Sequence, residues 1–232
     1  MSRPSRDLNP AAVSDALASG RRARAGQVEV TRQRILVTAE RLFAEHGVFS
    51  VSNRQISEAA GQGNNTAVGY HFGTKEDLIR ALVRRHTVPM AAIGRRLSDR
   101  YESSTDLRDW VTCVVRPFTD HLASLGSPSW YARFAAQVLA EPRLRELAAA
   151  ELGEASMLRD VAASLHRCLP TLAAEVLRER DDMARTLIVH VCAQRERSLG
   201  SSTGAAAAWA ATATSLIDVI VGMYLAPVSS PG

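Results

Sequence analysis

The chain has 232 residues, 46% of them hydrophobic, and a formal net charge of +4 at pH 7. This composition supplies a sizeable core for one domain or two, and the mildly basic balance favours polyanionic partners. The cysteines, Cys113, Cys168 and Cys192, are odd in number and widely spaced. They predict neither a disulfide framework nor a metal site, and they fit a reducing, cytoplasmic compartment.

Motifs typical of enzymes are absent from the sequence. The chain lacks a glycine-rich phosphate loop, a nucleophile elbow, a zinc motif and the Glu-x-x-His pattern of helical di-metal sites. His190 and Cys192 would leave one helix in different directions, which is poor geometry for metal ligands. We therefore expect a protein without enzymatic activity, cofactor or metal.

Residues 1–27 show no sustained hydrophobic period and end in a basic cluster of Arg21, Arg22 and Arg24. They predict a flexible basic arm rather than a targeting sequence, because they contain no apolar signal core. Such an arm is either a solvated tail or a segment that reaches the minor groove or the phosphates of DNA.

Apolar residues at helical spacing predict a first helix that begins near Thr31 and ends at Gly47. The face expected to be buried comprises Ile35, Ala39, Leu42 and Phe43. Thr31 and Arg32 stand at the start of this helix, where they are expected to contact phosphate; an equal alternative is that Thr31 only caps the helix.

The next segment predicts a short helix followed by a turn. Ser52 and Gln55 have the spacing of a capping box, and the helix that they begin ends at Gly61. Its buried side chains are expected to be Ile56, Ala59 and Ala60. Residues 62–65, Gln-Gly-Asn-Asn, form a poor helix and a good turn, because glycine and asparagine tolerate positive φ.

Two more helices follow this turn. Asn65 can cap a helix over residues 66–71, and Gly73 ends it. Thr74 then caps a helix that buries Leu78, Ala81 and Leu82. Two short helices across a small turn predict a helix-turn-helix.

Segments 56–61 (ISEAAG) and 70–78 (YHFGTKEDL) resemble the N-terminal domain of the TetR family of repressors, and the resemblance covers about residues 28–82. It implies an all-α homodimer whose last two helices form a four-helix interface and whose middle helices surround a small-molecule pocket. The chain departs from the family pattern in a turn that is one residue longer and in Gly69, where the family commonly has a tyrosine.

The N-terminal half of the second helix of a helix-turn-helix enters the major groove, and this predicts which side chains meet base edges. The expected base contacts are Gln62, Asn64, Asn65, Thr66 and Val68. Asparagine and glutamine suit adenine, although Asn64 and Asn65 serve equally well for turn geometry and capping. Gly69 either lets the backbone approach DNA closely or is simply tolerated in a short helix.

Phosphate contacts are expected from residues around this helix. Tyr70 and His71 are assigned to phosphate by the resemblance, and Arg54 belongs to the arginines that concentrate in the first third of the chain. Lys75 lies at a helix N-terminus, where its charge and the exposed amides both favour a phosphate.

Beyond Leu82 the chain predicts further helices without strand-like alternation. Pro89 is expected to break or kink the helix that begins at Thr74 and to provide a hinge. Later helices are expected from Thr105 to about Leu125, from Ser127, from Pro142, over residues 154–169 and over residues 181–199. We therefore predict an all-α protein with a basic arm (1–27), a helix-turn-helix domain (28–86) and a helical ligand-binding and dimerisation domain (87–226).

The last segment, residues 205–225, is almost continuously apolar and long enough to span a membrane. Asp218 and the alanine-rich first half favour a helix buried among other helices instead, and we expect no membrane partner. With residues 181–199 it would form the dimer interface implied by the resemblance. The expected interface residues are Leu187, Val191, Leu216, Ile220 and Met223.

The pocket implied by the resemblance would lie among the helices of residues 89–170. Its expected aromatic and soft lining is Tyr101, Trp110, Phe118, Trp130, Tyr131, Phe134 and Met157. Its expected polar residues are Arg116, His121, Arg133 and Gln137. The alternative is that these side chains are plain core and solvated surface.

Two functions follow from these patterns. The first is a homodimeric transcriptional repressor that binds a double-stranded DNA operator and is released by a small molecule. The alternative is a helical architectural or interaction protein that binds DNA by charge without a specific operator.

Overall fold

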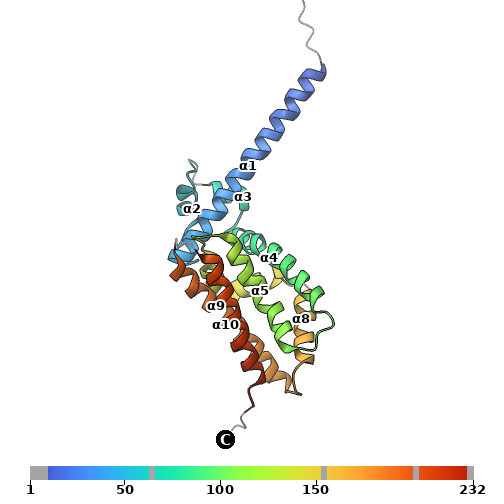
Figure 1. The fold of residues 1–232 in the computed structure, drawn as a ribbon. Helices are drawn as coiled ribbons and strands as arrows, with labels where there is room; N and C mark the ends of the chain where they lie inside the picture. The colour runs from blue at the N-terminus through green and yellow to red at the C-terminus, as the bar shows by residue number, and fades with distance from the viewer. Residues whose placement is uncertain (1–9, 63–65, 153–155, 201–203, 229–232) are drawn as a thin grey trace, which may run out of the picture.

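The computed structural model describes residues 10–62, 66–152, 156–200 and 204–228, and the regular structure within these ranges is entirely helical (Figure 1). The expected all-α class is confirmed. The helices are α1 (Pro10–His46), α2 (Asn53–Ala59), α3 (Ala67–Phe72), α4 (Lys75–Arg100), α5 (Leu107–Leu125), α6 (Tyr131–Ala140), α7 (Pro142–Leu152), α8 (Ser156–Arg167), α9 (Ala174–Leu199) and α10 (Ala205–Leu225).

The second half of α1, α2, α3 and the start of α4 form the predicted helix-turn-helix around a small apolar core. This core contains fully or almost fully buried side chains from all four helices: Ile35, Ala39, Phe43, Ile56, Ala60, Val68, Leu78 and Leu82. Ala59, which was expected to be buried, is exposed, because it lies on the solvent side of a helix of only seven residues.

Both predicted helix starts have the expected caps. The Ser52 hydroxyl accepts a hydrogen bond from the Gln55 amide, and the Gln55 side chain accepts one from the Ser52 amide at 2.8 Å. Thr74 and Asp77 form the same reciprocal pair at the start of α4. These contacts join residues three positions apart, so the sequence pattern alone is enough to specify them.

Helix α1 is much longer than the sequence predicted. It begins at Pro10 rather than near Thr31 and projects from the rest of the molecule as a rod (Figure 1). The expectation of a flexible arm over residues 10–27 is therefore wrong, and residues 1–9 lie outside the described ranges. Alanine and arginine dominate this stretch and are strong helix formers, but residues 24–30 are exposed, so no apolar period marks the helix.

The two internal prolines do not end their helices. Helix α4 continues through Pro89 and α5 continues through Pro117. A proline inside a helix removes a backbone hydrogen bond and costs about 3 kcal/mol. The packing of Val83, His86 and Gly94 on either side of Pro89 opposes that cost. The expected break at Pro89 is wrong, and α4 crosses the expected domain boundary at residues 86–87 as one helix.

The helices after α4 form a body in which α5 packs between α4 and α10, and α6 packs on α9 (Figure 1). Helices α7 and α8 cover the side of α4 and α5. The helix-turn-helix meets this body through α4, which belongs to both parts, and through contacts of α1 with α6. Two separate connections therefore lead from the body to the helix-turn-helix.

Candidate nucleic-acid interface

Helix α3, the expected recognition helix, is fixed to α2 by a buried hydroxyl. Ser57 of α2 is fully buried, and its Oγ accepts a hydrogen bond from the Val68 amide at 3.3 Å. The side chain of Val68 is also fully buried, so it cannot reach a base edge. The expected base contact by Val68 is wrong, because a six-residue helix must use its apolar side chains to pack on its neighbours.

The opposite face of α3 is open to solvent. Thr66, Gly69 and Tyr70 are exposed, and Tyr70 is 78% exposed. Apart from its chain neighbours and the backbone of α3 itself, no described atom lies within 4 Å of the position that a Cβ on Gly69 would take. Residues three and four positions apart share one helix face, so these residues form a continuous surface that a DNA groove can contact.

Of the other residues expected to read bases, the structure describes only Gln62. Gln62 is half-buried, and its amide nitrogen donates to the Ala60 carbonyl at 3.2 Å. Asn64 and Asn65 lie outside the described residues. Gly61, with φ of +68°, supplies the left-handed residue that ends the α2 region, as the sequence predicted.

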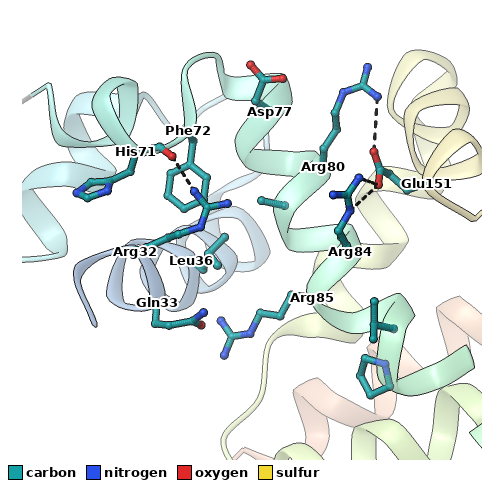
Figure 2. Close-up of a pocket in the computed structure, with 13 residues that line it drawn as sticks. Arg32, Gln33, Leu36, His71, Phe72, Asp77, Arg80, Arg84, Arg85 and Glu151 are labelled. Atoms are coloured by element: carbon teal, nitrogen blue, oxygen red, sulfur yellow. Dashed lines mark hydrogen bonds and ion pairs between the residues drawn. The ribbon is translucent and has the colours of Figure 1, made fainter. Parts of the chain in front are cut away.

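Two of the expected phosphate contacts instead connect parts of the helix-turn-helix. Arg32 Nη1 donates to the His71 carbonyl at 2.7 Å, and its guanidinium lies 4.2 Å from the centre of the Phe72 ring (Figure 2). Lys75 Nζ donates to the Val51 carbonyl at 2.6 Å, and burial lowers the pKa of this lysine. Both cations are half-buried, so their first effect is to hold α1, α3 and α4 in register.

The remaining expected contacts are on the surface or within α1. Arg54 is exposed and pairs with Glu58 at 2.8 Å, and the hydrogen bond from this pair raises the pKa of Arg54. The ring of His71, which is half-buried, meets that of Tyr70 edge-on at 5.0 Å. Thr31 is half-buried and lies inside α1, so the alternative that it caps this helix is wrong.

A groove of about 640 Å³ separates α1 from α4 and α7, and ion pairs cross its far side (Figure 2). Arg84 donates from Nε and Nη2 to one oxygen of Glu151, at 3.0 and 2.8 Å. Arg80 lies 3.7 Å from the other oxygen of Glu151. These contacts attach α7 to the part of α4 that also carries Leu78 and Leu82 of the helix-turn-helix core.

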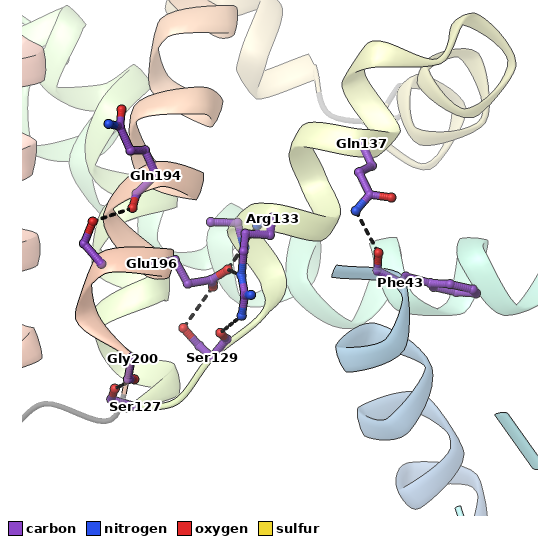
Figure 3. A network of polar contacts seen from close by, with 10 residues as sticks. Phe43, Ser127, Ser129, Arg133, Gln137, Gln194, Glu196 and Gly200 are labelled. Atoms are coloured by element: carbon purple, nitrogen blue, oxygen red, sulfur yellow. Dashed lines mark hydrogen bonds and ion pairs between the residues drawn. The ribbon is translucent and has the colours of Figure 1, made fainter. Parts of the chain in front are cut away.

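Gln137 of α6 connects the body to the end of α1 (Figure 3). Its amide nitrogen donates to the Phe43 carbonyl at 2.7 Å, and its amide oxygen accepts from the Val48 amide at 2.8 Å. Both backbone groups belong to the helix end and the loop that precede α2. Gln137 therefore has a structural role at this joint, and its expected role in a pocket stays a prediction.

A second connection is a buried chain of polar side chains from α1, α4 and α5. Glu40 Oε2 lies 2.8 Å from His86 Nε2, and His86 Nδ1 lies 2.8 Å from His121 Nε2. The His86 ring also stacks on Tyr131, with ring centres 3.7 Å apart. With a proton on Nε2 of each histidine, both contacts are hydrogen bonds donated in one direction, towards Glu40. Burial, with smaller effects of His86 and Arg85, lowers the pKa of His121 to about 4.

This lowered pKa predicts a loss of stability in mild acid. The ordinary pKa of histidine is 6.5, so the unfolded chain binds the proton of His121 at a higher pH than the folded protein does. The free energy of unfolding should therefore fall as the pH decreases from about 6.5 towards about 4. Thermal melting of His121→Gln across this range should show a shallower decrease than the wild type.

The matched control is His190→Gln, because His190 is an exposed histidine on α9. It should follow the wild-type pH dependence. If the stabilities of the wild type and His121→Gln decreased in parallel with falling pH, the loss of stability could not be assigned to His121 and its buried polar neighbours.

The expected pocket residues do not lie around one cavity. A cavity of about 740 Å³ is lined by residues of all six helices from α4 to α9. Three of the expected pocket residues contribute to its lining: Phe118, Tyr131 and Phe134. Trp110 is buried and donates from Nε1 to the Ser104 carbonyl, and Arg133 pairs with buried Glu196. Neither residue lines this cavity; Arg133 instead lines a separate hollow of about 520 Å³ together with Gln137 of α6 and His190 of α9.

Four more of the expected pocket residues do not line this cavity. Tyr101 follows α4 and packs on the core, Trp130 precedes α6, and Arg116 pairs with Asp120 at 3.3 Å. His121 belongs to the buried polar chain described above. The side chain of Met157 lies outside the described part of α8.

Two of the expected dimer residues are buried within the chain itself. Leu216 and Ile220 are almost or fully buried, on the face of α10 that packs against α5. Their assignment to a surface between two subunits is wrong. Leu187, Val191 and Met223 are half-buried.

Comparison with known sequences finds two family models that match the chain. One is described as bacterial regulatory proteins, tetR family, and matches residues 35–82; the other is described as tetracyclin repressor-like, C-terminal domain, and matches residues 112–223.

Among curated proteins, the HTH-type transcriptional repressor AcnR of Corynebacterium glutamicum is 43% identical over 63 residues, covering 27% of this chain and 33% of that protein. AcnR of Corynebacterium efficiens is 44% identical over 61 residues, covering 26% and 32%. The match thus spans about a third of the length of these relatives.

Solved structures share the fold over most of the chain. The TetR family transcriptional regulator PfmR from Thermus thermophilus has a TM-score of 0.50 at 18% identity, covering 85% of this chain and 98% of that one. A mutant of the protein HlyIIR has a TM-score of 0.50 at 15% identity, covering 86% and 97%. At these identities the likeness concerns the fold.

Proposed function

The chain belongs to the TetR family of bacterial regulatory proteins. We propose that it is a cytoplasmic transcriptional repressor that binds an inverted-repeat DNA operator as a homodimer. A small molecule releases it from the DNA. The observation that carries the proposal is the exposed face of α3, formed by Thr66, Gly69 and Tyr70 on a helix whose other face is locked to α2. A rigid, solvent-facing helix is what base reading in a major groove requires.

Charge-driven binding without an operator is less well supported. A protein that binds DNA only by charge needs a basic surface but no fixed reading helix. Here Arg32 and Lys75 are half-buried and donate hydrogen bonds within the helix-turn-helix. Part of the positive charge therefore stabilises the arrangement of the helices instead of neutralising phosphates. Two N–H groups of Lys75 are still available for a phosphate, which stays a prediction.

The proposal of a homodimer rests on the outer face of α10. By length and composition alone α10 could span a membrane, yet only 33% of its most apolar stretch is buried in the chain. Between residues 206 and 222 its exposed residues are mostly small and apolar: Ala206, Ala207, Ala210, Ala211, Thr214, Ser215, Asp218, Val219 and Gly222. Asp218 forms an ion pair with Arg108 at 2.6 Å, which is unfavourable in lipid.

A second copy of α10 is the cover that fits this face. Small residues let two helices approach closely, and a twofold axis would place α9 beside them with the exposed side chain of Met183. The interface that we propose is therefore the opposite face of α10 from Leu216 and Ile220. Such a dimer presents two α3 helices to successive turns of DNA.

Gly69→Ala tests whether α3 is the reading helix. The added Cβ meets no described atom within 4 Å, and alanine is a better helix former than glycine, so the thermal stability should stay the same or rise. DNA affinity should nevertheless fall by about tenfold or more, because the methyl group would stand between the α3 backbone and the groove. Fluorescence anisotropy with operator DNA, paired with thermal melting, separates the two effects.

Unchanged DNA affinity in Gly69→Ala would remove this helix face from the contact surface. A fall in both stability and affinity would instead show that the side chain disturbs the fold.

A further inference from the structure

The cavity between α4–α9 has an apolar interior. Its walls include Met90, Phe118, Tyr131, Phe134 and Val138, of which Tyr131, Phe134 and Val138 are buried. Its volume of about 740 Å³ lies within the usual range of roughly 300–1,000 Å³ for small-molecule sites. The interior therefore suits a ligand with a substantial apolar part.

The mouth of this cavity is positively charged. Arg145 of α7, Arg159 of α8 and Arg185 of α9 line it, opposed by Glu146 alone. Arg185 also pairs with Asp182 at 2.7 Å. Arg145 and Arg159 are exposed and form no ion pair with any described residue. Two unpaired guanidinium groups at the edge of an apolar cavity are suited to an anionic group, because guanidinium binds carboxylate and phosphate through paired hydrogen bonds.

We propose that this cavity binds an amphipathic anion, with its apolar part among the aromatic side chains and its carboxylate or phosphate group at Arg145 and Arg159. The inference rests on the proposed function, since it gives the chemical class of the effector. A neutral or cationic molecule of the same shape gains the apolar contacts but not the charge-assisted hydrogen bonds.

The structure also connects this cavity to the helix-turn-helix. Tyr131 lines the cavity, and its ring stacks on His86, which contacts Glu40 of α1. On the other side, α7 carries both Arg145 at the mouth and Glu151, the partner of Arg84 on α4. A bound anion would thus contact α6 through Tyr131 and α7 through Arg145. Both helices contact α4, which positions α3 together with α1.

Calorimetry with ten-carbon probes tests the proposal on the full-length protein without DNA. Decanoate or decyl phosphate should bind, and the tighter of the two identifies the anionic group; decanol and decylammonium should bind about tenfold more weakly or not at all. The double variant Arg145→Ala/Arg159→Ala should lose about tenfold in affinity for the anion. Arg143→Ala, an exposed arginine on the same helix outside the lining, should bind like the wild type.

Any of three results would overturn the proposal. Decanoate and decanol could bind with equal affinity, Arg143→Ala could lose as much affinity as the double variant, or neither anion could bind. Operator binding of the ligand-free protein is measured separately. Failure there counts against the proposed function and leaves the calorimetry unaffected, so the two failures are distinguishable.

Discussion

Replacing Glu196 with alanine is expected to lower the free energy of unfolding by about 3–5 kcal/mol, which is the usual cost of removing one partner from a buried ion pair. Glu196 is 4% exposed. Its carboxylate accepts hydrogen bonds from the Ser129 hydroxyl, the Ala132 amide, and the amide and Nε of Arg133, at 2.9–3.1 Å (Figure 3). Alanine would leave two amides at the start of α6 without their partner and would remove the only carboxylate that pairs with the mostly buried Arg133 guanidinium among the described residues, which would keep its hydrogen bond to the Ser129 carbonyl.

Chemical denaturation monitored by circular dichroism measures this change. Glu196→Gln retains oxygen and volume but loses the charge, so its cost should be smaller than that of alanine. The neighbouring Arg197→Ala changes an exposed side chain and should alter the stability by less than about 0.5 kcal/mol. A loss under about 1 kcal/mol in Glu196→Ala would contradict a structural role for this carboxylate.

Val219→Glu is expected to convert the proposed dimer into a monomer and to reduce operator affinity by about 100-fold or more, because linked binding to two half-sites commonly contributes roughly 10²–10⁴-fold. Val219 is 57% exposed, so the charge should not disturb the fold of a single subunit. In the dimer it would meet its own symmetry mate on the neighbouring α10, where two carboxylates repel each other. Sedimentation velocity and anisotropy with operator DNA measure the two effects.

The matched control is Val88→Glu, since Val88 is 62% exposed but lies on α4. This variant should remain a dimer. A dimeric Val219→Glu would place the subunit interface elsewhere. The same experiment at Ile220 would be uninformative, because Ile220 is fully buried against α5 and a charge there would unfold the subunit.

The features that the sequence predicted well depend on neighbours in the chain. The Ser52 and Thr74 caps join residues three positions apart, and the apolar period of Ile35, Ala39 and Phe43 defines a helix face directly. Helix α10 was predicted with its observed bounds for the same reason.

The features that the sequence missed depend on distant partners. Gln137 contacts Phe43 across 94 positions, and Glu196 contacts Arg133 across 63. A polar side chain on an otherwise amphipathic helix indicates solvent exposure by default, and only the packing of α6 on α1 and α9 reverses this. No local signal could have shown that Glu196 is buried.

Helix α10 shows a different limit. Both of its faces are apolar, so the sequence does not determine which face packs inside the subunit. In the structure the larger side chains, such as Leu216 and Ile220, pack on α5 and the smaller ones stay outside. The dimer residues expected from the sequence include Leu216 and Ile220 on the large face, whereas close helix pairing between subunits favours the small face.

We propose that the open face of α3 reads a specific DNA sequence, once in each subunit of a dimer. Selection of the full-length protein against random double-stranded DNA at physiological salt, with sequencing of the bound pool, tests this most directly. We expect enrichment of an inverted repeat whose half-sites are spaced for successive major grooves, about one helical turn apart. A bound pool without sequence preference, combined with binding that decreases steeply as salt rises, would contradict it and would mean association by charge alone.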